Sequence, residues 1–342
     1  MVATQLRRWL FAWLAACVAA STCCAQESER AFFAGKIVRI VVGSGSGGGY
    51  DIYARLIAPY LSKALDATVI VENQPGAGGI TSLNRLYVSP PDGLTMSFAN
   101  GTSAAFAQIT EQPGLRFDLA KFGYLATVGA PPGLWLVGPD APVKSVRDVL
   151  KTKKKWQWGA AGPADGLGNG AAFTCEALKL DCQIVPGYNG SNQAALAVTR
   201  GEMDAVYIPE SSANNFVKAK QNFALATMAR KKSRWFLDRP TIFDAVDLDA
   251  DGQWLLDFHS SVEDLGRIMI LPPGVPKARL AFLQTAVKEV LHNPQLIEEG
   301  ERTERIIEYL DPESTLKNAL AVVEKVTGEQ KKRVQTIVAR NK

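Results

Sequence analysis

The sequence predicts an α/β protein made of two lobes, and three observations support this prediction. Strand-like apolar runs alternate with amphipathic helix patterns, the order expected of βαβ units with a largely parallel sheet. Two proline-rich segments, at residues 129–142 and 272–276, interrupt this order like crossovers between lobes. The length of 342 residues, with 47% hydrophobic side chains, is enough for two domains of ordinary size.

The first part of the chain shows the alternation most clearly. Asp51 follows a glycine loop and is the predicted N-cap of the first helix. Each expected strand ends in small or polar residues, and ligands of open α/β sheets bind beyond the carboxyl ends of the strands. The expected elements are strand 36–42, helix 51–65, strand 68–72, helix 80–88 and strand 94–98.

The alternation of expected strands and helices restarts after residue 133, which predicts the second lobe. The runs 134–137 and 267–271 are interpreted as two hinge strands, so the first lobe is discontinuous. A cleft between lobes is a favoured place for ligands. The expected division is a signal peptide at 1–25, a first lobe at 36–135 plus 270–342, and a second lobe at 136–269.

Two glycine-rich turns stand out, Gly43-Ser-Gly-Ser-Gly-Gly-Gly49 and Pro75-Gly-Ala-Gly-Gly79. Glycine lets the backbone approach a ligand closely, and a helix N-terminus offers unpaired N–H groups at the positive end of its dipole. The two turns together predict one cradle for a small anionic group. A strand-to-helix turn without any ligand is the structural alternative.

The first glycine turn also fits another functional class. Gly43, Gly45 and Gly48 have the spacing of a dinucleotide-binding fingerprint, and Glu72 ends the next strand, where a ribose-binding acid would lie. An exported nucleotide-binding oxidoreductase is therefore the alternative function. A Walker A motif is excluded because no Lys-Ser/Thr pair follows the glycines, and no convincing hydrolase nucleophile elbow is present.

The N-terminus predicts export. Arg7 and Arg8 precede an apolar run at 9–20 that is too short to span a bilayer, and cleavage is expected after Ala25. The expected location is therefore the periplasm. A lipobox ending at Cys17 ranks second and would give a lipid-anchored protein instead.

Charge and composition exclude several classes of site. The net charge is +4, and two of the positive charges belong to the signal, which argues against a nucleic-acid surface. His259 and His292 are the only histidines and lack the spacing of metal ligands, so no metal or cofactor is expected. After cleavage only Cys175 and Cys182 remain, as a disulfide in an oxidising compartment or as two buried thiols.

Several motifs resemble those of the solute-binding receptors of tripartite tricarboxylate transporters, also called Bug receptors. The resemblance covers nearly the whole mature chain. The matching pieces are the run from Lys36 to Gly43, Gly47-Gly-Gly-Tyr-Asp-Ile-Tyr-Ala-Arg-Leu56, Val71-Glu-Asn-Gln-Pro-Gly-Ala-Gly-Gly79, Pro91-Asp-Gly-Leu94, Gly187-Tyr-Asn-Gly-Ser191, Gly201-Glu-Met-Asp-Ala205 and Pro272-Pro-Gly-Val-Pro276.

The resemblance implies a periplasmic binding protein fold of type II character, with two α/β lobes that close on a small organic acid. It also implies a non-enzymatic receptor that delivers its solute to the membrane subunits of a transporter, and we expect a monomer. First-lobe loops of the family hold a carboxylate. Their counterparts here are Ser44, Gly47, Gly48, Gly78, Gly79, Asn100 and Thr102.

The second lobe departs from the family pattern, so the solute is not transferable. Residues 164–170 contain no histidine where a glycine-serine loop followed by histidine is common, and Glu210 replaces a phenylalanine-aspartate type sequence. Asp165 and Glu210 are either ligand contacts or solvated loop acids. The expected contacts of this lobe are Asp165, Asn169, Tyr188, Asn189 and Glu210.

Overall fold

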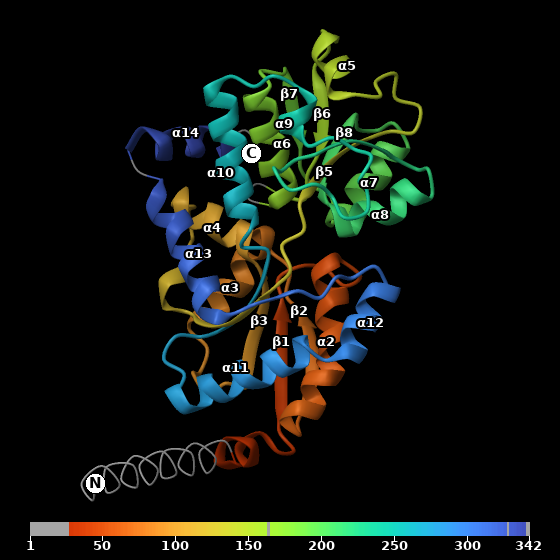
Figure 1. Ribbon diagram of the computed structural model, residues 1–342. Helices are drawn as coiled ribbons and strands as arrows, with labels where there is room; N and C mark the ends of the chain where they lie inside the picture. Colours follow the sequence, from red (N-terminus) through yellow and green to blue (C-terminus); the bar gives the residue numbers. More distant parts are fainter. Residues whose placement is uncertain (1–26, 163–164, 327, 340–342) are drawn as a thin grey trace, which may run out of the picture.

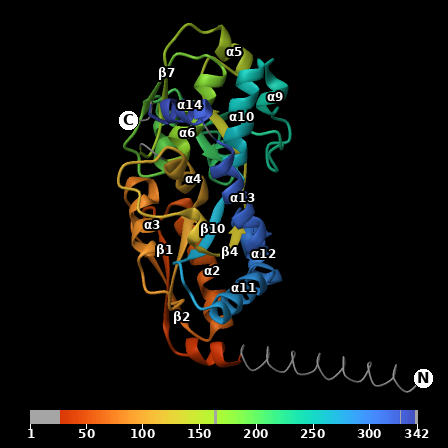
Figure 2. The same ribbon diagram turned by 90° about the vertical axis from the view of Figure 1, so that its left-hand side faces the viewer.

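The computed structural model describes residues 27–162, 165–326 and 328–339. Figures 1 and 2 show two α/β lobes, one above the other, each built around its own sheet. This arrangement confirms the predicted α/β class and the two lobes. The expected signal peptide at 1–25, with Cys17, lies outside the described residues.

The first sheet has six strands in the order β11-β4-β10-β3-β1-β2. β1 is parallel to β2 and β3, whereas β10 is antiparallel to β3 and β4. The parallel part is the βαβ unit that the sequence predicts, and β10 returns to it from far along the chain. The strands are β1 (Ile37–Val42), β2 (Thr68–Asn73), β3 (Thr95–Asn100), β4 (Gly123–Val128), β10 (Arg267–Leu271) and β11 (Tyr309–Leu310).

The second sheet has five strands in the order β7-β6-β8-β5-β9. β6 is parallel to β7 and β8, and β5 is antiparallel to β8 and β9. The strands are β5 (Gly133–Val137), β6 (Trp156–Gly159), β7 (Cys182–Val185), β8 (Ala205–Pro209) and β9 (Phe223–Thr227).

Helices cover both faces of the sheets. α2 packs against β1, β2 and α11, whereas α6 packs against β8 and α10. The longer helices are α2 (Gly49–Leu65), α3 (Ile80–Tyr87), α4 (Gly101–Ile109), α6 (Gly166–Ala177), α7 (Ser191–Thr199), α8 (Glu210–Lys218), α10 (Ala250–Glu263), α11 (Lys277–Leu291), α12 (Pro294–Arg302), α13 (Pro312–Lys325) and α14 (Gly328–Ala339). The short ones are η1 (Ala77–Gly79), η2 (Leu119–Lys121), α5 (Val146–Lys151) and α9 (Ile242–Ala245).

The predicted N-cap of the first helix is wrong. α2 begins at Gly49, with Gly48 as an extended N-cap residue that makes no side-chain cap bond. Asp51 instead accepts a hydrogen bond from the Gly47 amide at 2.8 Å and pairs with Arg55 Nε at 2.9 Å. A carboxylate in the first helical turn thus braces the glycine loop and also favours the positive end of the helix dipole.

The two expected hinge strands are full members of the sheets. β5 lies wholly in the second sheet and β10 wholly in the first. The connections between the sheets are therefore the short segments 129–132, before β5, and 264–266, before β10. The lobe limits themselves stay a prediction.

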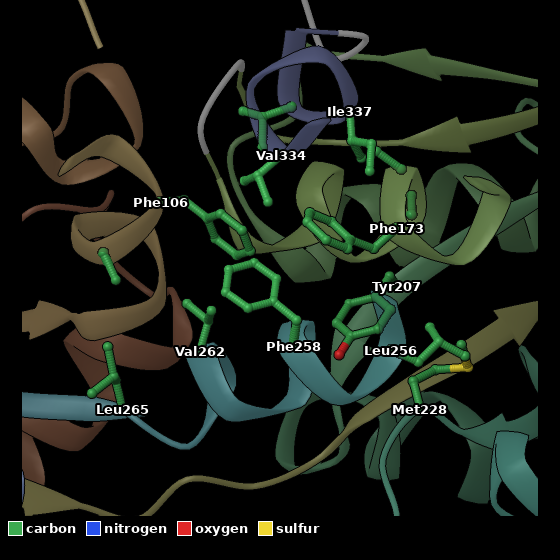
Figure 3. Close-up of a cluster of buried hydrophobic side chains, with 14 of the residues drawn as sticks. Phe106, Phe173, Tyr207, Met228, Leu256, Phe258, Val262, Leu265, Val334 and Ile337 are labelled. Atoms are coloured by element: carbon green, nitrogen blue, oxygen red, sulfur yellow. The ribbon is translucent and has the colours of Figure 1, made fainter. Parts of the chain in front are cut away.

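A continuous apolar cluster joins the lobes on the face formed by α4, α6 and α10 (Figure 3). Phe106 of α4 and Phe173 of α6 have ring centroids 5.4 Å apart, and Phe106 is 6.2 Å from Phe258 of α10. Val334 and Ile337 of α14 belong to the same cluster. We call this cluster the apolar seam, because it buries side chains of both lobes together.

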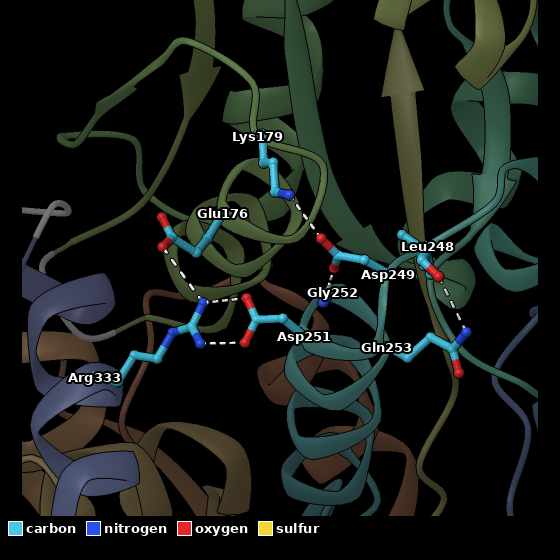
Figure 4. Close-up of polar contacts among 8 residues, drawn as sticks. All are labelled: Glu176, Lys179, Leu248, Asp249, Asp251, Gly252, Gln253 and Arg333. Atoms are coloured by element: carbon cyan, nitrogen blue, oxygen red, sulfur yellow. Dashed lines mark hydrogen bonds and ion pairs between the residues drawn. The ribbon is translucent and has the colours of Figure 1, made fainter.

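Polar contacts fix the C-terminal helix to the second lobe (Figure 4). Arg333 of α14 forms a two-pronged ion pair with Asp251 of α10 and also lies 3.7 Å from Glu176 of α6. Figure 1 shows α13 running beside the first lobe and α14 beside α10. Although the first lobe was expected to extend to residue 342, its last described helix packs against α6.

Cys175 and Cys182 form a disulfide between the last turn of α6 and β7. This resolves the two alternatives left by the sequence. In the part of the chain that the structure describes, no helix has both the length and the apolar character needed to cross a membrane.

Candidate functional site

The two glycine turns of the first lobe touch each other. A Cβ built on Gly43 would lie 2.7 Å from the Gly79 Cα and 2.6 Å from Ser82 Oγ, so no larger residue fits there. Gly78 and Gly79 have φ of 67° and 96°, in the region that glycine adopts without strain. The structure therefore brings together the two turns that the sequence singles out.

Several amides of this predicted cradle already have partners inside the protein. The Gly79 amide donates to the Gly76 carbonyl at 2.9 Å, and the Gly48 amide donates to the Gly45 carbonyl at 3.3 Å. Together with the Gly47 bond to Asp51, these contacts stabilise the turns themselves. In this conformation the three amides are not donors to a solute.

Ser44 is the better polar candidate in the first turn. Its carbonyl accepts a hydrogen bond from Asn73 Nδ2 at 3.0 Å, which ties the end of β2 to this turn. Its Oγ is buried and has no hydrogen-bond partner within residues 27–162, 165–326 and 328–339. Buried hydroxyls are normally paired, so this atom is suited to a ligand contact.

Asn100 and Thr102 lie at the beginning of α4 and differ in role. Asn100 Oδ1 accepts the Ser103 amide at 3.1 Å as the N-cap. Thr102 is buried, and its hydroxyl donates to the Val262 carbonyl of α10 at 3.4 Å. Asn169, on α6, is completely buried. Thr102 and Asn169 therefore lie inside helices between the lobes rather than on an open rim.

Both acids left open by the sequence have structural partners. Asp165 is the N-cap of α6 and accepts the Gly162 and Leu167 amides at 2.7 and 2.8 Å, while burial raises its pKa above the usual range. Glu210 is 3% exposed and accepts the Ser233 hydroxyl at 2.6 Å and the Arg234 amide at 3.0 Å. Neither is a solvated loop acid.

The loop before α7 offers a solute fewer polar groups than the sequence predicts. The Asn189 amide donates to Gln193 Oε1 at 2.6 Å, and the Tyr188 ring lies 3.3 Å from a Cβ built on Gly159. Ser191, the first residue of α7, lies beside α8, with its Oγ 3.2 Å from Ser212 Oγ.

Four helices begin where the lobes approach each other. A Cβ built on Gly49, the first residue of α2, would lie 3.7 Å from Ser212 in the first turn of α8. A Cβ built on Gly166, the first residue of α6, would lie 3.8 Å from Asn100, the N-cap of α4. Helix N-termini carry positive partial charge, which favours an anion in this region. Asn100 and Asp165 already accept amides in the first turns of α4 and α6.

The sequence reasoning missed the main cation of this region. Arg267 begins β10, is 4% exposed, and donates from Nη2 to Ser211 Oγ at 2.9 Å across the lobes. A single arginine at the start of the apolar run 267–271 was the available signal. Glu72, the ribose-binding acid of the alternative function, pairs with Arg39 at 2.9 Å instead.

Comparison with known proteins places this geometry in a family. Residues 53–338 match the family described as tripartite tricarboxylate transporter family receptor. A relative, a UPF0065 protein of Bordetella pertussis, is 26% identical over 274 residues, covering 78% of this chain and 80% of that protein.

Solved structures share the fold at low sequence identity. MatC of Rhodopseudomonas palustris, with bound malate, has a TM-score of 0.72 at 21% identity, covering 89% of this chain and 99% of that one. The periplasmic binding protein BugD has a TM-score of 0.72 at 20% identity, covering 88% and 97%. The fold is thus that of periplasmic binding proteins, as the resemblance implied.

The family consists of solute-binding receptors and not of enzymes, so the oxidoreductase alternative for the loop 43–48 is not retained. The chain belongs to the receptor family of the tripartite tricarboxylate transporters.

Proposed function

We propose that this receptor captures a small organic acid between its lobes and delivers it to the membrane subunits of a tripartite tricarboxylate-type transporter. The observation that supports this most is the meeting of the N-termini of α2 and α8 at Gly49 and Ser212. Oriented N–H groups of this kind bind a carboxylate without a metal or cofactor.

Two structural neighbours support the class of solute. One is described with malate and the other, Rpa4515 of R. palustris, with adipate. The second has a TM-score of 0.70 at 19% identity and covers 89% of this chain. Both molecules are small carboxylates. We extend only this class to the present chain, because its second-lobe loops differ from the family pattern.

We also propose that the protein works in the periplasm, as a monomer, after removal of residues 1–25. The disulfide between Cys175 and Cys182 agrees with an oxidising compartment. N-terminal sequencing of the periplasmic fraction tests the processing. A full-length cytoplasmic product would contradict the proposed location, and a lipid on Cys17 would move the protein to a membrane anchor.

Binding is tested on the freshly purified mature protein. Native mass spectrometry identifies a co-purified solute, and calorimetric titration with short mono- and dicarboxylates measures affinity. We expect binding of organic acids, and a Ser44→Ala variant that binds more weakly while melting like the wild type. Tight binding of NAD together with no response to any organic acid would refute the proposed function.

A further inference from the structure

A pocket lies where α2 and α8 meet, beside the segments that join the lobes. Tyr53 of α2 and Arg267 of β10 line it from the first lobe, and Ser211 of α8 and Trp235 line it from the second. We call it the hinge pocket. Of the residues predicted for the solute site, only Glu210 lines it.

Arg267 has a buried charge without a counter-ion. Its Cζ lies 4.3 Å from the centre of the Tyr53 ring, and its Nη2 donates a hydrogen bond to Ser211 Oγ. Nε has no hydrogen-bond partner, and the guanidinium forms no salt bridge, in the described part of the chain. A buried charge is costly unless it is paired, so Arg267 itself lacks a direct negative partner.

A second arginine converges on the same serine. Arg305 Nη1 donates to the Ser211 carbonyl at 3.3 Å, and its Nε is likewise buried without a partner among the described residues. Burial lowers the pKa of Arg305, and the nearby charge of Arg267 lowers it further. The two positive charges repel each other, and an anion bound at Arg267 would reduce this repulsion.

The carboxylates around the pocket are already engaged. Glu308 pairs with Arg234 at 2.5 Å, and Glu210 accepts the Ser233 hydroxyl and the Arg234 amide. On the rim, Lys231 and Lys232 are exposed. The N-terminus of α8, whose second residue is Ser211, adds the positive end of a helix dipole.

We propose that Arg267 and the first turn of α8 bind an anionic group in the hinge pocket, and that Arg305 positions this turn through its hydrogen bond to the Ser211 carbonyl. Its position rests on the observations above, whereas the identity of its solute rests on the proposed function. Arg267 belongs to the first lobe and Ser211 to the second, so an anion bound here bridges the lobes and stabilises their closed arrangement.

The anionic group has two chemically equivalent sources. Ser212, next to Ser211, would lie 3.7 Å from a Cβ built on Gly49 at the start of α2, and Tyr53 lies one helical turn, about 6 Å, further along α2. The distal acid of a dianionic solute held at that helix end would therefore reach the pocket. A free inorganic anion such as phosphate is the other source.

The test uses the mature protein and matched ligands. Succinate, glutarate and adipate are titrated beside butyrate, valerate and caproate, the monoacids of equal length, and inorganic phosphate is titrated alone. Tryptophan fluorescence reports the pocket, with Trp235→Phe showing which part of the signal is local. The variants are Arg267→Gln and Arg305→Gln, and the control is Arg230→Gln, an exposed arginine paired with Asp257 at 2.6 Å.

If the solute supplies the anion, diacids bind the wild type at least tenfold more tightly than monoacids, since a charge-assisted bond contributes about that much or more. This preference disappears in Arg267→Gln and persists in Arg230→Gln. If a free anion fills the pocket, phosphate gives a saturable Trp235 signal that Arg267→Gln and Arg305→Gln lose. The comparison in wild-type protein stays decisive if a variant fails to fold.

Equal affinity for mono- and diacids with no phosphate signal overturns the hinge receptor and leaves the proposed function standing. A diacid preference or phosphate signal that survives in folded Arg267→Gln also overturns it. Arginine-dependent phosphate binding without binding of any organic acid supports the pocket and refutes the proposed solute.

Discussion

Glu263→Gln is expected to change how the stability of this receptor depends on pH. Glu263 ends α10, and its carboxylate accepts a hydrogen bond from the Tyr207 hydroxyl. Burial is the main cause that raises its pKa from 4.5 to about 8. Glutamine keeps an oxygen for the Tyr207 hydrogen bond but does not titrate, so the variant isolates the ionisation.

The direction of this pH dependence follows from how many protons the folded and unfolded states bind. Between pH 4.5 and 8 the folded protein holds a proton on Glu263 that the unfolded chain has lost, so the free energy of unfolding falls as pH rises. His259 acts in the opposite sense. Burial lowers the pKa of His259 from 6.5 to about 3, so its contribution to the free energy of unfolding increases as pH rises from 3 to 6.5. The two effects oppose each other between pH 4.5 and 6.5, and only the Glu263 effect remains above 6.5.

The size of this stability change follows from the shift in the pKa of Glu263. A carboxyl with these two pKa values loses roughly 1.5 kcal/mol of folding stability between pH 6.5 and 8. Glu263 keeps some solvent contact, so we expect about 1 kcal/mol. Urea unfolding of wild type and Glu263→Gln at several pH values measures the difference. Glu324→Gln, at an exposed position on α13, is the control.

The variant should match the wild type near pH 5 and exceed it at pH 8. Parallel stability profiles of the wild type and Glu263→Gln from pH 5 to 8 would refute the reasoning. A variant whose stability falls further below that of the wild type as pH rises would show that the carboxylate, rather than the acid, is the form that the fold prefers.

Three further predictions concern the fold and the site. Replacing Cys175 and Cys182 by alanine removes a cross-link between residues 7 positions apart. The free energy of unfolding, measured in urea without reductant, should fall by about 2.5 kcal/mol, and an unchanged value would contradict this prediction. Phe173→Ala should cost about 3–5 kcal/mol and keep one unfolding transition, because the apolar seam is shared; two separate transitions by calorimetry would disprove the shared core. Gly78→Val should weaken solute binding about tenfold or more by calorimetric titration, through loss of one charge-assisted bond, and should lower the melting temperature because φ is 67° there. Wild-type affinity in its folded fraction would remove this turn from the site, and Gly78→Asn, which tolerates this backbone, is the control.

The sequence predicted those parts of the fold that depend on local pattern. The run from β1 to β3 follows from alternating apolar residues and glycine turns, so its order was foreseeable. β4 was missed because its partners β10 and β11 come more than a hundred residues later, and antiparallel pairing over such a distance leaves no local signal. β11 has only two residues, too few for a period-two pattern.

The sequence predicted the contact between the two glycine turns, which backbone chemistry decides, and missed contacts that depend on tertiary structure. The contact between Gly43 and Gly79 follows from two glycine turns on neighbouring parallel strands. The capping role of Asp165 was not separable from a ligand role, because an acid before a helix fits both. Arg267 was overlooked because one arginine before four apolar residues resembles a solvated strand end; only the register of β10 beside β3 buries it.

The two faces of the interlobe region differ in a way that constrains how the receptor closes. On the α4, α6 and α10 face the lobes share the apolar seam, and separating Phe106 from Phe173 would expose buried surface at a cost in free energy. On the α2 and α8 face the contacts are polar, including Arg267 with Ser211 and Lys218 with Glu304. Polar contacts exchange readily for water, because their net free energy is small. We therefore expect the apolar seam to resist separation of the lobes, and the polar contacts of the α2 and α8 face to rearrange more readily when the lobes move.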